Sequence, residues 1–167
     1  MTIFTTENFV VRAFVDGDAA DCERFLADRD VMRFIGDGNF RFEKTSALKM
    51  IQWFRRTCEN SKGLGTWAIM SKTTSEVIGN CHLSEFAPAN ATEFGIALEK
   101  KYWGHGYATE ICRALLNYGR KDLALAEIVG TVHAGNEASK RLLGKLGYRF
   151  KSSVEHHGIT QELHSTI

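Results

Sequence analysis

Two glycines, Gly104 and Gly106, lie where an apolar extended run meets an amphipathic helix. The run EFGIALE (93–99) precedes them, and YATEICRALLNYG (107–119) follows with apolar residues every three or four positions. Glycines let a ligand approach bare backbone, and the first N–H groups of a helix lack intrahelical partners and carry partial positive charge. The junction therefore predicts a loop that opens a helix and can hold an anion, with phosphate as the first candidate.

Hydrophobic periodicity predicts strands and helices in a mixed order along the chain. The expected strands span 9–14, 66–71, 77–86, 92–98, 126–133, 148–155 and 159–167, and the expected helices span 19–28, 30–35, 44–60, 107–119 and 136–147. The three consecutive strands are expected to be antiparallel, and a helix, a strand, a helix and two closing strands follow them. This order indicates a mixed sheet with helices on both faces, rather than a doubly wound or an all-β fold.

Local signals add detail at several element ends. Asp16 or Asp18 is expected to cap the helix at 19–28, and KTTSE (72–76) is expected to connect two strands of a hairpin. Asn136 is the expected N-cap of the helix that Gly147 follows. Apolar faces are expected on two helices, formed by Leu48, Ile51, Phe54 and Cys58 on one and by Ala108, Ile111, Leu115 and Tyr118 on the other.

Composition predicts one globular domain over residues 1–167. The chain has a formal net charge of +1 and no long block of like charge, which argues against a nucleic-acid or membrane partner. Its cysteines lie far apart without a C-x-x-C pair, so they are expected to be reduced core thiols and not metal ligands: Cys22, Cys58, Cys81 and Cys112. The N-terminus has no signal-peptide pattern, and the expected location is the cytoplasm.

Two interpretations of the glycine turn follow from the residues alone. A dinucleotide-binding loop is one, because Gly104-x-Gly106 begins a G-x-G-x-x-G pattern and Glu127 follows about 20 residues on. Thr109 replaces the third glycine, and the first glycine lies several residues beyond the strand, so this interpretation is weak. A structural turn without a ligand is the other.

A third interpretation comes from a family resemblance. The segments KKYWGHGYATEICRALLNYG (100–119) and NEASKRLLGKLGYRF (136–150) resemble two linked motifs of the GCN5-related N-acetyltransferases, in the branch that acetylates N-termini of ribosomal proteins. The segments at 9–36 and 92–110 resemble the first strand and helices and the central strand and phosphate loop of that branch. The resemblance implies an α+β fold with a mostly antiparallel sheet of about seven strands, splayed between the fourth and fifth, and helices on both faces.

The resemblance also implies acetyl-CoA as co-substrate, with no metal. Loop amides would cradle the pyrophosphate, and the pantetheine arm would lie along the splayed strand near Leu98. Lys101 stands where the family has Arg or Gln, while Trp103 and Tyr107 are expected mainly as core aromatics. The residues expected to bind coenzyme A are Ile96, Ala97, Leu98, Lys101, Trp103, Gly104, His105, Gly106, Tyr107, Ala108, Thr109, Asn136, Ser139 and Arg141.

Direct transfer of acetyl to an amine requires a base, an oxyanion donor and an acid for the thiolate. By the resemblance, Glu93 is the expected base, working through a water, with Glu85 as a rival and His82 as a weaker one. A backbone N–H between Gly95 and Leu98 is the expected oxyanion donor. Ser139 is the expected acid, since the tyrosine that other branches use is absent.

Amine chemistry favours one acceptor class. At pH 7 roughly a tenth of α-amines are neutral against well under a thousandth of lysine amines, a difference of about 3 kcal/mol. The expected acceptor is therefore a protein N-terminal α-amine. Three alternatives stay open: a small amine such as an antibiotic, polyamine or amino-acid derivative; a non-catalytic acyl-CoA sensor; and, least favoured, a nucleic-acid module based on SKRLLGKLGYRFK (139–151). The expected quaternary state is a monomer or homodimer.

Overall fold

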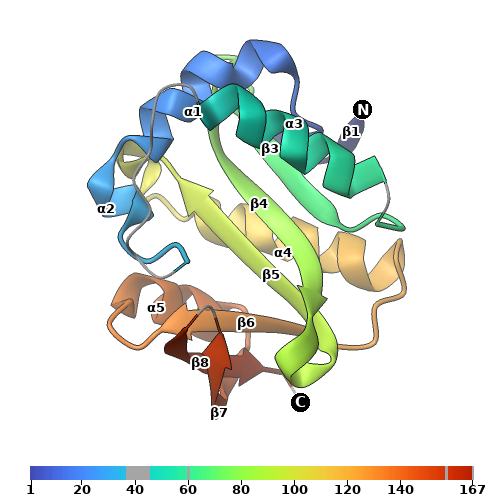
Figure 1. Cartoon of the computed structure of the whole chain (residues 1–167), viewed down its shortest axis with the longest axis vertical. Helices are drawn as coiled ribbons and strands as arrows, with labels where there is room; N and C mark the ends of the chain where they lie inside the picture. The colour runs from blue at the N-terminus through green and yellow to red at the C-terminus, as the bar shows by residue number, and fades with distance from the viewer. Residues whose placement is uncertain (37–45, 60, 157, 167) are drawn as a thin grey trace.

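The described part of the chain contains one sheet of eight strands in the order β1-β2-β3-β4-β5-β6-β8-β7 (Figure 1). The computed structural model describes residues 1–36, 46–59, 61–156 and 158–166. The strands are β1 (Thr2–Thr5), β2 (Phe9–Arg12), β3 (Gly65–Ser71), β4 (Val77–Phe86), β5 (Ala91–Leu98), β6 (Ile128–His133), β7 (Arg149–His156) and β8 (Ile159–Ser165). The helices are α1 (Ala19–Leu26), α2 (Arg29–Met32), α3 (Ser46–Glu59), α4 (Tyr107–Lys121) and α5 (Glu137–Lys145), with short 3-10 turns η1 (Asp16–Asp18), η2 (Ala87–Ala89) and η3 (Lys100–Tyr102).

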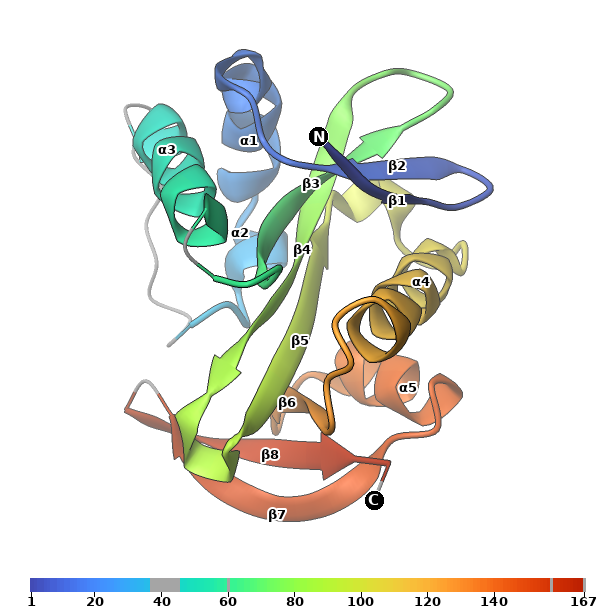
Figure 2. The same cartoon turned by 90° about the vertical axis from the view of Figure 1, so that its right-hand side faces the viewer.

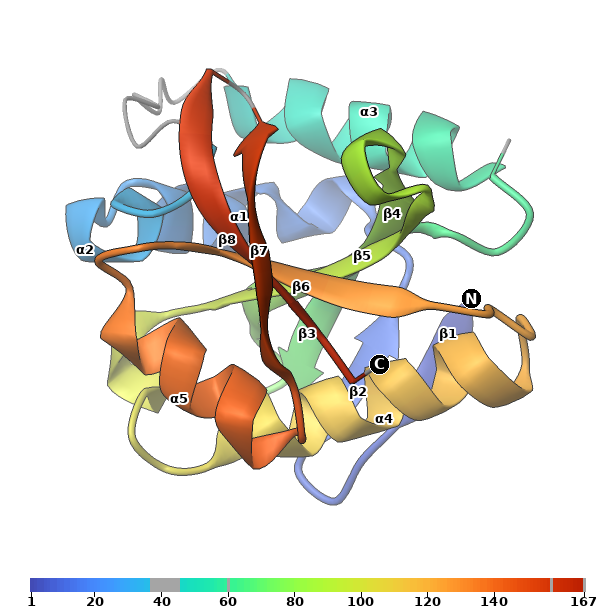
Figure 3. The same ribbon diagram turned by 90° about the horizontal axis from the view of Figure 1, so that it is seen from below.

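Helices cover both faces of this sheet. Figure 2 shows α1, α2 and α3 on one side and α4 and α5 on the other, and the view from below gives the same division (Figure 3). Neighbouring strands are antiparallel except β5 and β6, which are parallel. The expected mixed, mostly antiparallel sheet is confirmed. A dinucleotide fold, which needs a parallel sheet, is excluded.

The sheet has eight strands where about seven were expected, because Thr2–Thr5 forms an additional edge strand. It pairs antiparallel with β2 through a tight turn. Only four residues long and partly exposed, it lacks the alternating apolar pattern that marks a half-buried strand. The expected splay between the fourth and fifth strands therefore falls between β5 and β6.

The apolar faces of two helices build the core on either side. Ile111 and Leu115 of α4 are fully buried against the sheet, with Ala108 and Tyr118 packed at the margin, as predicted. On the opposite face Ile51 of α3 is fully buried.

One residue of the predicted α3 face is misplaced. Leu48 was expected in the core but is 42% exposed, and Ala47 is buried instead. The buried stripe runs through Ala47, Ile51 and Phe54, so Leu48 lies round the helix from it.

The predicted cap of α1 is also wrong. Neither aspartate side chain accepts a hydrogen bond from the first amides of that helix. Asp18 instead accepts from the guanidinium of Arg12 and from the backbone N–H of Val15, each at 2.8 Å. The buried carboxylate thus joins β2 to the start of α1. The other local predictions are confirmed: residues 72–76 connect β3 to β4, and the side chain of Asn136 caps α5.

The four cysteines are free, as predicted. Cys22, Cys81 and Cys112 are buried, and Cys58 is half-buried. Burial raises the pKa of Cys22 and of Cys112 to about 12, so these thiols stay protonated near neutrality. Among the helices that the structure describes, none has the length and apolar character needed to cross a membrane.

The feature that positions the site is a partial separation of β5 from β6. The two strands pair only at Thr92, Glu93 and Phe94 of β5. Beyond Phe94, β5 continues beside β4 as far as Leu98, while β6 runs on beside β8. The predicted splay is therefore present, with one edge of β5 open between the strands.

Candidate active site

Polar side chains of β4 lie on the sheet face that α1, α2 and α3 cover. Cys81 and Leu83 belong to the core beneath α4, so the alternate residues Asn80, His82 and Ser84 point to the opposite face. All three are half-buried. A row of polar groups on a covered sheet face needs hydrogen-bond partners, which makes it a candidate for function.

Glu93 extends this row onto β5. It lies opposite Ser84 in the β4–β5 register and is half-buried. The hydroxyl of Thr131, on β6, donates a hydrogen bond to its Oε1. Thr131 follows Gly130, the last β6 residue paired with β5, so the bond spans the strands where they begin to part. Glu93, the expected base, therefore lies at the point where β5 and β6 begin to separate.

The two rival bases are placed differently. His82 is opposite Gly95 on the same face as Glu93, whereas Glu85 is exposed and points to the other side of β4. Burial lowers the pKa of His82, and the negative charge of Glu93 acts in the opposite direction. His82 and Glu93 therefore form one group, and Glu85 lies outside it.

Beyond Phe94, no described strand pairs with the edge of β5 that faces β6. The N–H of Thr92 donates to Glu127 on the β6 side, and the N–H of Glu99 donates to Ile78 on the β4 side. Because backbone groups of alternate residues point to alternate edges, those of Ile96 and Leu98 face the splay. The N–H groups of these two residues fall within the predicted stretch for an oxyanion or pantetheine donor.

Trp103 occupies one of the acceptors on that edge. Its indole N–H donates to the carbonyl oxygen of Leu98 at 2.7 Å. The ring is 43% exposed, so the expected core position for Trp103 is wrong. Tyr107 does pack at the margin of the core, edge-on to Phe9, and exposed His105 stacks on it.

The glycine turn at the start of α4 has the backbone conformation expected of an anion site. Gly104 and Gly106 have φ of 79° and 83°, and a Cβ on either would meet nothing within 4 Å. The requirement for glycine is therefore conformational, and the space before the turn is open. Within the described chain, no hydrogen bond takes up the N–H groups of residues 104–108. Free amides, a helix N-terminus and open space fit a diphosphate.

Glu110 in the first turn of α4 anchors this turn to the N-terminal hairpin. Its two carboxylate oxygens accept from the backbone and side-chain nitrogens of Asn8 at 3.0 and 2.9 Å. Burial alone would raise the pKa of Glu110, but hydrogen bonds from Thr6 and Asn8, with the charge of Lys72, outweigh it and lower the pKa. The start of α4 is thereby tied to the β1–β2 turn.

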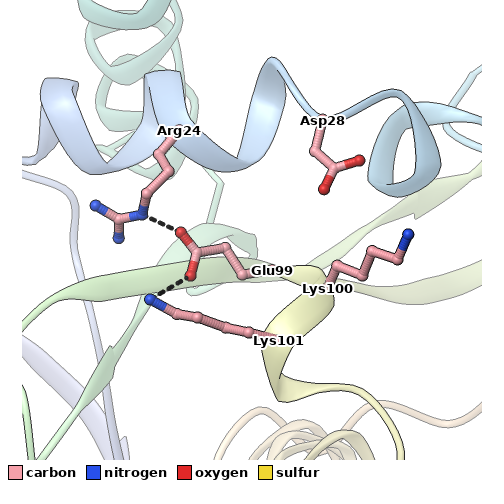
Figure 4. Close-up of a pocket in the computed structure, with 5 residues that line it drawn as sticks. All are labelled: Arg24, Asp28, Glu99, Lys100 and Lys101. Carbon is pink, nitrogen blue, oxygen red and sulfur yellow. Dashed lines mark hydrogen bonds and ion pairs between the residues drawn. The ribbon is translucent and has the colours of Figure 1, made fainter.

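Lys101 forms ion pairs with carboxylates and not with the glycine turn. Its ammonium lies 3.0 Å from Glu99 and 3.6 Å from Glu76. Lys101 and Glu99 line a pocket of about 470 Å³ together with Arg24, Asp28 and Lys100. Figure 4 shows Glu99 between Lys101 and Arg24. Each cation of this pocket has a carboxylate partner, since Arg24 pairs with Glu99 and Asp21 and Lys100 pairs with Asp30. In this arrangement the pocket offers no unpaired cation to the phosphate turn.

The start of α5 lies at the same edge of the sheet as the start of α4. Since β5 and β6 are parallel, the helices that follow them, α4 and α5, begin at the same edge of the sheet on either side of the splay. Asn136 caps α5 by accepting from the N–H of Ser139 at 3.2 Å. Ser139 is half-buried in the first turn, and Arg141 is exposed.

Two residues that pair with groups of this region were not predicted from the sequence. One is Thr131, the partner of Glu93. The sequence feature that could have indicated it is a polar residue inside the apolar strand IVGTVH (128–133). Arg24 is the other: it pairs with buried Glu99 across 75 positions of sequence. Among the residues that the structure describes, no group of His, Cys, Asp or Glu could hold a metal ion.

Comparison with known proteins agrees with this geometry. Residues 8–149 match the family model described as the acetyltransferase (GNAT) domain. The chain is 30% identical to the uncharacterized N-acetyltransferase YoaA of Bacillus subtilis (strain 168) over 148 residues, covering 88% of this chain and 82% of that protein. It is 27% identical over 128 residues to FsC-acetyl coenzyme A-N(2)-transacetylase of Aspergillus fumigatus (strain ATCC MYA-4609 / CBS 101355 / FGSC A1100 / Af293), covering 72% and 53% of the two chains.

Solved structures share the fold. RimL, a ribosomal L7/L12 alpha-N-protein acetyltransferase in complex with coenzyme A, superposes with a TM-score of 0.82 at 13% identity over 99% of this chain and 97% of that chain. The matched domain covers most of the sequence and brings together the splayed strands and the glycine turn. The chain therefore belongs to the GNAT acetyltransferase family and is an acetyl-CoA-dependent N-acetyltransferase.

Proposed function

We propose that this enzyme acetylates α-amines at protein N-termini, with Glu93 as the base. The observation that carries the proposal is the half-buried carboxylate of Glu93, fixed by Thr131 where β5 and β6 separate. A single carboxylate there can receive one amine. The continuous sheet from β1 to β7 supports treating residues 1–167 as one domain.

The residues before and after the splay fit coenzyme A. The amides of residues 104–108 would hold its pyrophosphate, and the N–H groups of Ile96 and Leu98 would hold its pantetheine arm and the thioester oxygen. Asn136 and Ser139, at the facing helix start, would border the sulfur end. When bound, acetyl-CoA supplies the acetyl group as a thioester.

Different residues of this chain then accept and donate the protons of the reaction. Glu93 orients the amine, directly or through a water, and removes its proton as nitrogen attacks. A backbone N–H of β5 stabilises the negative charge that develops on oxygen. Ser139 donates a proton toward the leaving thiolate. The amine and the thioester meet at the splay from opposite faces of the sheet, because the polar row faces α1–α3 and the phosphate turn begins α4.

The acceptor class follows from charge and amine chemistry. Glu93 is the one carboxylate of the polar row, whereas a polyamine would favour several acids. An α-amine with a pKa near 8 needs only modest help from such a base. RimL, which shares this fold, is named as an α-N-protein acetyltransferase. The relative from Aspergillus fumigatus is named as an N(2)-transacetylase, and it makes a small-molecule amine the second candidate.

A panel of acceptors tests the proposal by thiol release at pH 7. Peptides with a free N-terminus should react at least tenfold faster, by kcat/KM, than N-terminally blocked peptides containing lysine and than spermidine or amino-acid derivatives. Glu93→Gln should suppress transfer to every acceptor. Faster transfer to small amines than to any peptide would replace the proposed acceptor with the second candidate.

A further inference from the structure

His82 lies beside Glu93 and has no part in the roles proposed so far. Both side chains are on the same sheet face, on neighbouring strands, with His82 opposite Gly95 and Glu93 two residues before Gly95. Cross-strand diagonal neighbours of this kind are within reach of long side chains. The electrostatic influence of Glu93 on His82 agrees with their proximity.

Gly95 makes room for the imidazole. A Cβ at Gly95 would lie 2.2 Å from Cε1 of His82 and 2.9 Å from its Nε2. Gly95 has no positive φ, so the position needs glycine for space and not for backbone conformation. The ring therefore rests directly on the β5 backbone, between Glu93 and the open edge that begins beyond Phe94.

Glu93 alone is poorly suited to keep a proton taken from an amine. A carboxylate ordinarily has a pKa near 4.3, against about 8 for the amine, so it gives such a proton up again readily. An imidazole, with an ordinary pKa near 6.5, is a better match near neutral pH.

The surroundings of His82 favour a neutral ring and place one negative charge, that of Glu93, where it can balance an imidazolium. Burial lowers its pKa, so the ring is unprotonated near neutrality and able to accept a proton. On β3 it faces Thr66, whose carbonyl accepts from the thiol of Cys58 on α3. Burial raises the pKa of Cys58, so that thiol is neutral too. Of the described groups around His82, only Glu93 brings a charge that acts on it.

We propose that His82 and Glu93 act as one proton-accepting pair, in which the imidazole keeps the proton that the acceptor amine gives up and the carboxylate balances its charge. This rests on the proposed transfer to an amine. The N–C bond forms, the C–S bond breaks, and the amine proton passes by way of Glu93, or a water held by it, to a ring nitrogen of His82. The thiolate takes its proton from Ser139, which regains one from solvent, and the imidazolium later releases its own proton to solvent.

Titration of the histidine ring carbons by NMR tests the pair without relying on activity. In Glu93→Gln the midpoint of His82 should fall by about one pH unit, because the charge that stabilises its imidazolium is gone. His164 is a matched control, since its Nε2 lies 3.1 Å from Glu162 in a different part of the sheet, and its midpoint should stay unchanged. An unchanged His82 midpoint overturns the pair.

Kinetics of two variants supply the second readout. His82→Ala should lower kcat at least tenfold with little change in KM for acetyl-CoA. In wild type, kcat should fall at acid pH with the same midpoint for acceptors whose amines differ in pKa, and His82→Ala should remove this acid limb of the pH profile. Gly95→Ala should lower kcat similarly by displacing the ring. In the His82→Ala background, Gly95→Ala should have no further effect, because its Cβ then meets no imidazole.

The outcomes separate the two proposals. If the wild-type enzyme transfers acetyl to no amine, the proposed function is overturned, whatever the titration midpoint of His82. Wild-type transfer together with normal kcat and an unaltered acid limb in His82→Ala overturns the pair and leaves the proposed function standing.

Discussion

The hydroxyl of Thr131 donates a hydrogen bond to Oε1 of Glu93 across the boundary between paired and parted strands. This bond holds the carboxylate on the face that carries His82, where an amine can reach it. One residue of β6 thus positions the carboxylate of Glu93.

Removal of the carboxylate or of its partner should have separable effects. Glu93→Gln should lower kcat by roughly 100-fold or more, as expected for loss of a general base. Thr131→Val should lower kcat less, because the base remains but is no longer fixed, and Thr131→Ser should restore most of it. Thiol release under saturating acetyl-CoA measures both, and a Thr131→Ser variant as slow as Thr131→Val would contradict the role of the hydroxyl.

Substitution of either turn glycine should weaken acetyl-CoA binding. Gly104→Ala and Gly106→Ala force alanine into positive φ, which costs about 1 kcal/mol or more and distorts the amides that would hold the diphosphate. The expected result is at least a tenfold rise in the Kd for coenzyme A by calorimetry.

Two glycines outside the turn are matched controls for this effect. Gly147 also has positive φ (85°), so Gly147→Ala should reduce stability without changing Kd. Gly144 lies inside α5 with open space around it, and Gly144→Ala should raise stability by about 0.5–1 kcal/mol. Unaltered coenzyme A affinity in both turn variants would exclude the turn as the anion site.

Loss of the Asn136 cap should lower stability by a predictable amount. Asn136→Ala removes the acceptor for the Ser139 N–H and should cost about 1 kcal/mol in the free energy of unfolding, measured by urea denaturation. Asn136→Asp keeps a capping oxygen and should retain that stability. If both variants also raise KM for acetyl-CoA, the amide contacts the co-substrate as well; if only Asn136→Ala does, the cap alone is responsible.

Glu110 should make folding stability depend on pH in the acid range. Its pKa is lower in the folded protein than in the unfolded chain, so its ionised form adds stability above the unfolded pKa. That contribution is lost as the pH falls below about 5 and through the folded pKa. Wild type should therefore lose more stability than Glu110→Gln between pH 6 and pH 3 in denaturation experiments, and parallel curves would refute the prediction.

Local patterns were sufficient for most elements because they depend on neighbours in sequence. The five-residue connection of β3 to β4, the Asn136 cap and the apolar face of α4 were each predictable from residue type and spacing. Leu48 and the aspartates before α1 were mispredicted because their roles depend on what packs against them. Asp18 had an arginine of β2 within reach, which binds its carboxylate more strongly than helix amides do.

Residue type and spacing are enough to specify the glycine turn, the helix it opens and the strand that leads into it, since φ preferences, capping and periodicity act over a few residues. Three relationships arise only in the folded chain: β5 and β6 separate after Phe94, Thr131 donates to Glu93, and His82 lies against Gly95. These relationships join strands far apart in the chain. Their geometry is set by register and by the packing of helices on both faces, which no local pattern encodes.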